Sequence, residues 1–152
     1  MKDNSILDTL IEIALKEDLG DAGDITSNFF IDNNSLSSGT IIAKENCVIA
    51  GSEIAERVFK RLDPNIEVKV ELPSGSIAST GDVIISLSGK SCSILSTERI
   101  ALNFLQRLSG IATITKKYVD AVKGTNAMIL DTRKTTQDGE CLKKWLSNQV
   151  VD

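Results

Sequence analysis

Apolar residues recur every three or four positions in two segments of the N-terminal half, the spacing that gives a helix one apolar face. The first segment follows Ser5, a residue type that caps helices, and stops at Gly20. The second opens at Gly51-Ser52 and ends at Asp63-Pro64. Between them, Asp21 to Ser27 predict a loop whose acidic side chains are solvated or cap a helix, with contact to a ligand as the less favoured alternative.

Short apolar or alternating runs from residue 39 onward predict strands separated by turn residues. The predicted strands are Thr40 to Lys44, Cys47 to Ala50, Ile66 to Leu72 and Val83 to Leu87. The first two are close enough to pair around Glu45-Asn46. The third alternates apolar and charged residues, which is the pattern of a half-buried strand. Turns are expected at Pro73-Ser74-Gly75 and Gly81-Asp82.

Two more helical segments and one more strand are predicted after residue 90. Ser96 is suited to cap the third helix, and Ser109-Gly110 predicts its end. A fourth helix is expected over Ile111 to Val122, and the apolar run Ala127 to Leu130 predicts a strand. Strands followed by two helices and a new strand predict an α+β fold, with a compact domain up to about Leu95 joined to the start of another unit.

Composition narrows the class of protein. The 152 residues are 41% hydrophobic and 25% charged, which are ordinary globular values, and the net charge of −4 gives no global cation field for nucleic acid. No apolar run reaches the length of a membrane span, and Met1-Lys2-Asp3-Asn4 lacks the apolar core of a signal peptide, so a cytoplasmic location is expected.

The three cysteines are widely spaced, which favours ordinary buried thiols at Cys47 and Cys92. The chain has no histidine, which excludes histidine metal sites and imidazole bases.

The segment Asp131 to Thr136 carries the clearest chemical signal. It places two cations and three hydroxyls directly after the apolar run Ala127 to Leu130, as expected where a buried strand ends in an anion-binding loop. This segment and Gln106 to Thr113 together resemble passages of the quinolinate phosphoribosyltransferases, the decarboxylating nicotinate-nucleotide pyrophosphorylases. Residues 17–20 and 23–26 match a further passage, and the resemblance covers about residues 5 to 136.

The resemblance implies two domains. Residues 1–110 would form an N-terminal α/β sandwich domain with a mainly antiparallel sheet. Residues 111–136 would begin an incomplete α/β barrel, whose first strand is Ala127 to Leu130. Active sites of such barrels lie at the C-terminal ends of the strands, where Asp131 to Thr136 falls.

The resemblance also implies the reaction and the residues for it. The family joins quinolinate to phosphoribosyl pyrophosphate and releases carbon dioxide, pyrophosphate and nicotinate mononucleotide. Arg133 would bind a quinolinate carboxylate, and Lys134 would act as the catalytic cation at the phosphate or carboxylate cluster. Thr132 and Thr135 would add neutral donors. Arg107 would enter the active site of the neighbouring subunit of a homodimer, or else serve only as a cation near the end of its helix.

The resemblance also implies supporting polar residues and a metal ion. Glu98 and Asn103 lie within the matching stretch and are expected to be supporting polar residues. Magnesium would accompany the pyrophosphate-bearing substrate, but the family's ligands lie in later barrel strands, so no metal ligand is assigned in this chain.

The resemblance stops after Thr136. Family members continue with Pro-Gly and a long further segment, whereas this chain continues with Gln137 and ends at Asp152. Allowed codons for this tail, preceded by one restored C, can be read as Pro-Gly-Trp-Arg-Val-Leu-Glu-Lys-Met-Ala-Val-Lys-Ser-Gly-Gly-Gly, which resembles the family's continuation. Residues 137–152 are therefore predicted to be an out-of-frame tail, with Cys141 and Trp145 serving no function.

Two alternatives to a working transferase stay open, and a third is disfavoured. The chain could be a non-catalytic fragment, for example an oligomerisation module, or a paralogue that acts on a different substrate. A biotinyl-type or lipoyl-type carrier is disfavoured, because Lys44 and Lys69 lack the hairpin-tip setting of a modifiable lysine.

Overall fold

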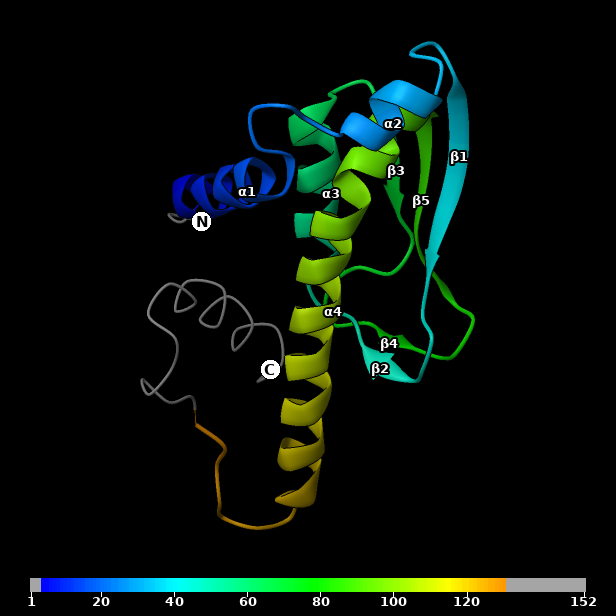
Figure 1. The fold of residues 1–152 in the computed structure, drawn as a ribbon. Helices are drawn as coiled ribbons and strands as arrows, with labels where there is room; N and C mark the ends of the chain where they lie inside the picture. The colour runs from blue at the N-terminus through cyan, green and yellow to red at the C-terminus, as the bar shows by residue number, and fades with distance from the viewer. Residues whose placement is uncertain (1–3, 131–152) are drawn as a thin grey trace.

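A computed structural model describes residues 4–130, with side chains from residue 6 onward. A three-stranded antiparallel sheet, in the order β1-β5-β3, lies beside a layer of helices (Figure 1). Strands β2 and β4 form a separate antiparallel pair. The elements are α1 (Asn4–Leu19), α2 (Ile25–Phe30), β1 (Leu36–Ile42), β2 (Cys47–Val48), α3 (Ser52–Leu62), β3 (Glu67–Val70), β4 (Ile77–Ala78), β5 (Val83–Lys90) and α4 (Ser91–Ala121). The predicted α+β class is confirmed.

The helices of the N-terminal half follow their periodic patterns. Helix α1 ends just before Gly20, which takes a left-handed φ of 55°. Helix α3 buries the face that contains Val58 and Phe59 and ends before Asp63, as predicted. The loop predicted up to Ser27 is shorter than expected. Helix α2 begins at Ile25, because Asp24 caps it through the backbone N–H of Ser27.

The sheet confirms the strand pattern but changes the pairing. Strand β3 alternates exposed and half-buried residues as predicted. The predicted pairing of Thr40 to Lys44 with Cys47 to Ala50 is wrong. Strand β1 pairs instead with β5, where Ile41 lies opposite Ile85, and β2 pairs with β4. Pairing with β5 gives β1 a long partner that contains the buried Ile84, Ile85 and Leu87, and a local hairpin would not provide one.

Helix α4 differs most from expectation, since it is one helix of 31 residues. Ser96 is not its cap but lies buried inside it, and Ser109-Gly110 does not interrupt it. Helix α4 stays helical across these weak helix formers because it packs against α3 and against the segment after β2. The strand predicted at Ala127 to Leu130 is not formed. A strand needs a neighbour to satisfy its backbone, and the described residues provide none there.

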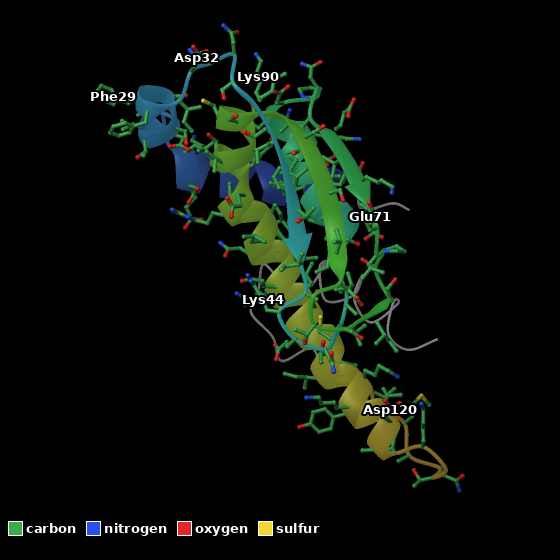
Figure 2. The ribbon with its side chains drawn as sticks, turned by 90° about the vertical axis from the view of Figure 1, so that its right-hand side faces the viewer. Phe29, Asp32, Lys44, Glu71, Lys90 and Asp120 are labelled. Carbon is green, nitrogen blue, oxygen red and sulfur yellow. The ribbon has the colours of Figure 1, made fainter. Side chains whose placement is uncertain are left out.

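The core lies between the sheet and helices α3 and α4. Its largest fully buried apolar side chains are Phe59, Ile11, Ile49, Ile66, Ile85 and Val58. In the part of the chain that the structure describes, no helix is both long and apolar enough to cross a bilayer. Helix α4 continues well beyond the sheet toward Asp120 (Figure 2).

Candidate functional site

The segment with the strongest chemical signal falls outside the described residues. Thr132, Arg133, Lys134 and Thr135 all belong to it, so their predicted roles stay predictions. The predicted out-of-frame tail, residues 137–152, also lies outside. Of the predicted substrate-binding residues, only Arg107 has a described position.

Arg107 lies in the middle of α4 and not at a helix end. Its side chain is exposed, and it makes no ion pair or side-chain hydrogen bond with the residues that the structure describes. The helix dipole acts mainly within the last turn, and α4 continues to Ala121, so a role as a C-terminal helix cation is excluded. The charge of Arg107 therefore has no counter-ion within residues 4–130.

A polar hollow of about 520 Å³ lies between the α1–α2 connection and the N-terminal half of α4. Its walls include Glu98 and Asn103, the predicted supporting residues, together with Gln106. Arg107 does not line it. Arg99 does, and its Nη1 lies 3.1 Å from Oδ1 of Asp18. Sequence reasoning did not single out Arg99, although its spacing from Asn103 and Gln106 places all three on one helical face.

Asp24 holds in place the wall of this hollow that faces α4. Its carboxylate accepts hydrogen bonds from the backbone N of Ser27 at 3.0 Å, from Oγ of Ser27 at 2.5 Å and from Oγ of Ser96 at 3.2 Å. The bond from the Ser27 hydroxyl contributes most to holding the pKa of Asp24 below its usual value, so the group is ionised at neutral pH. Asp24 therefore joins α2 to α4, which confirms the capping role predicted for this segment.

The motif around Ser109 has a structural role in this domain. Oγ of Ser109 accepts a hydrogen bond from the N of Ala50 at 3.0 Å and donates one to its O at 3.2 Å. One turn further on, Oγ1 of Thr113 accepts a hydrogen bond from the N of Val48 at 2.9 Å. These side chains partner the N–H groups of Val48 and Ala50, while the N and O of Ile49 bond to the backbone of Ser76 and Gly75.

A second hollow of about 510 Å³ lies between residues 41–47 and the middle of α4, with Gln106, Gly110 and Ile114 in its wall. Cys47 also lines it and is half-buried; burial raises the pKa of its thiol, and Glu45 raises it further. This thiol is poorly suited to act as a nucleophile. Cys92 is likewise half-buried, so the two cysteines predicted to be buried thiols are only partly buried.

Acidic and thiol side chains do not gather into a metal site in the described part of the chain. No group of three or more His, Cys, Asp or Glu residues that could hold an ion occurs there. None of the described residues is therefore assigned to the magnesium that the resemblance implies.

Comparisons with known proteins agree with this architecture. Residues 24–109 match the family model "Quinolinate phosphoribosyl transferase, N-terminal domain". The chain is 39% identical over 136 residues to quinolinate phosphoribosyltransferase [decarboxylating] 1b of Nicotiana tabacum, covering 90% of this chain and 38% of that protein. It is 37% identical over 142 residues to a probable nicotinate-nucleotide pyrophosphorylase [carboxylating] of Synechocystis, covering 93% of this chain and 48% of that protein.

Solved structures give the same picture. NadC from Streptococcus pyogenes superimposes with a TM-score of 0.90 at 32% identity, over 99% of this chain and 54% of that one. Nicotinate-nucleotide pyrophosphorylase from Ehrlichia chaffeensis gives 0.89 at 37% identity, over 95% and 52%. The chain spans less than half the length of the two sequence relatives and about half the length of the two structures. The chain belongs to the quinolinate phosphoribosyltransferase family, with its N-terminal domain matched over residues 24–109.

Proposed function

We propose that this chain supplies the N-terminal domain of an enzyme that transfers phosphoribose from phosphoribosyl pyrophosphate to quinolinate. The ring nitrogen would bond to the sugar carbon as pyrophosphate leaves, and one carboxylate would then leave as carbon dioxide, with a proton from solvent taking its place on the ring carbon. The observation that carries the proposal is the family match over residues 24–109, supported by the names of the relatives.

The proposed ligand-binding residues suit substrates dense in negative charge. Arg133 would hold a carboxylate through two parallel donors, and Lys134 would be the catalytic point charge. Thr132 and Thr135 would add neutral donors. Such a site works largely by positioning the substrates and by stabilising charge as it moves.

Arg107 is proposed to reach the site of a neighbouring subunit in a homodimer. Its exposure and its lack of a partner among the described residues support this role. Arg99 is a second candidate, because it lines the polar hollow while Arg107 does not. Its ion pair with Asp18 is largely exposed, so an anionic ligand could compete for the guanidinium.

We further propose that this chain alone does not catalyse the reaction. The two sequence relatives are more than twice as long as the matched region, and the magnesium ligands are expected in barrel strands beyond it. The alternative of a non-catalytic oligomerisation module predicts association without turnover even in a lengthened protein. The cytoplasmic location stays a prediction, because the names of some plant relatives carry chloroplastic and mitochondrial labels.

The test uses a lengthened protein in which residues 1–136 continue into the remaining residues of the Synechocystis relative. We expect the lengthened protein to convert quinolinate and this chain alone to convert none. Arg133→Ala should lower kcat/KM by at least about tenfold, because a hydrogen bond to a charged group contributes about 1.5–3 kcal/mol. Lys60→Ala, on the exposed side of α3, is the matched control and should leave kcat/KM unchanged.

Two further variants identify the arginine that crosses to the neighbouring subunit. Arg107→Ala and Arg99→Ala are each mixed with the Arg133→Ala protein, and the crossing arginine is the one whose mixed dimers regain activity. Conversion of quinolinate by this chain alone would refute the proposed inactivity. An inactive but folded lengthened protein would refute the proposed transferase.

A further inference from the structure

Arg99 and Asp18 form an ion pair inside the polar hollow. Among the described residues that line this hollow, Arg99 is the one cation, and its Nη1 lies 3.1 Å from Oδ1 of Asp18. The side chain of Asp18 is 25% exposed, whereas that of Arg99 is 76% exposed. Asp18 is therefore the enclosed member of the pair, and the long side chain of Arg99 is the member whose direction can be set.

The position of Asp18 is fixed by the packing of α1. Asp18 lies in the last turn of this helix, which ends at Leu19. The N of Gly20 donates a hydrogen bond to the O of Lys16 at 2.9 Å and closes the turn. Ile11 of the same helix is fully buried in the core and holds α1 against the rest of the domain. The carboxylate of Asp18 is thus presented to Arg99 from a packed helix.

Stability does not account for an acid at this position. A carboxylate in the last turn of a helix opposes the helix dipole. An ion pair that is largely exposed contributes little to the free energy of unfolding. Asp24, on the same hollow, differs because its carboxylate binds Ser27 and Ser96 and joins α2 to α4. Within the described part of the chain, the side-chain partner of Asp18 is Arg99.

The geometry of the pair leaves Arg99 able to bind an anion. A guanidinium carries five N–H donors in a rigid plane, and Asp18 accepts from Nη1 alone. An anion can bind the donors at Nη2 and Nε while Asp18 keeps its place. A side chain whose direction is already restricted loses less freedom on binding.

We propose that Asp18 is a positioning residue, which directs the guanidinium of Arg99 toward an anionic group of the substrate. The inference rests on the proposed function, with Arg99 as the arginine that reaches the substrate. Asp18 itself does not contact the substrate and acts through Arg99.

The first measurement is made on the full chain by the heteronuclear NOE of the arginine Nε atoms, which reports fast side-chain motion. Nε of Arg99 gives a higher value than Nε of Arg107, which has no described ionic partner. Asp18→Asn lowers the value at Arg99 to that at Arg107, and it keeps or raises Tm because the acid opposes the helix dipole. Asp8→Asn is the matched control. It removes another ion pair of α1, with Arg57 at 3.4 Å, and leaves the NOE of Arg99 unchanged.

Kinetics of the lengthened protein give the effect on the substrate. Asp18→Asn raises KM at least about fivefold for the substrate whose KM also rises in Arg99→Ala, and it changes kcat less than about twofold. In the Arg99→Ala background the same change alters kcat/KM less than about twofold, because Asp18 acts through the guanidinium. Asp18→Glu keeps the charge and recovers at least about half of the lost kcat/KM. Asp8→Asn leaves KM and kcat unchanged.

Three results overturn the proposal: an equal NOE at Arg99 in the parent and in Asp18→Asn, an additive loss in the double variant, or mixed dimers that assign the crossing role to Arg107. The NOE does not depend on turnover. An inactive lengthened protein refutes the proposed reaction, whereas the NOE still decides whether Asp18 restrains Arg99, so the two failures are distinguishable.

Discussion

The contact of Ser109 with Ala50 gives a sharp prediction of stability. Both residues are buried, and Oγ of Ser109 forms hydrogen bonds with both the N and the O of Ala50. Ser109→Ala leaves a buried backbone N–H without a partner, which costs about 1–3 kcal/mol. The gain in helix propensity returns about 0.5 kcal/mol. We therefore expect a net loss of about 1.5 kcal/mol, or about 3–6 °C in Tm for a chain of this size.

Ser52→Ala is the matched control. Ser52 is fully buried, but its Oγ has no hydrogen-bond partner of good geometry among the described residues. Removing it should change the free energy of unfolding by less than about 0.5 kcal/mol or increase it. Thr113→Val should resemble Ser109→Ala, because the N–H of Val48 then loses its acceptor. The double variant should lose less than the sum, since both side chains hold the same segment.

Urea unfolding followed by circular dichroism at neutral pH provides the measurement. The slope of the transition should stay constant while the midpoint shifts, because the surface exposed on unfolding is unchanged. The reasoning fails if Ser109→Ala and Ser52→Ala have equal midpoints, or if Ser109→Ala lies within about 0.5 kcal/mol of the parent.

Three further outcomes follow from described contacts. Burial alone would raise the pKa of Glu53, but hydrogen bonds from the Oγ and N of Ser74 outweigh it and hold the pKa below its usual range. The stability from this lowered pKa is present above the unfolded value and is lost on acidification, so Glu53→Gln should flatten the fall in Tm below about pH 5. Gly51→Ala should destabilise by about 1–3 kcal/mol, because φ is 91° and the new Cβ meets the buried Leu108, and thermal melts without that loss would contradict the argument. Gly110→Ala should stabilise by about 1 kcal/mol in the same melts, and a lower Tm would show that the position is not open.

The sequence and the structure draw attention to different residues of the candidate site. The sequence around Ser109 by itself resembles the family, yet the structure shows that Ser109 and Thr113 hold the backbone of Ala50 and Val48 in place. Arg99 gave no signal of its own, since a single arginine on a helix is common. Only the fold places it in a hollow opposite the acidic α1–α2 connection.

The sequence by itself determined the elements whose evidence is local. The apolar face of α3, the end of α1 at Gly20 and the alternation of β3 all follow from which side chains face the core. Tertiary structure decided what depends on distant partners. Strand β1 pairs with the distant β5, which places Ile41 opposite the buried Ile85, and α4 runs through Ser109-Gly110 because packing outweighs two weak helix formers. Local pattern encodes which residues are buried, whereas the choice of partner depends on contacts between residues far apart in the chain.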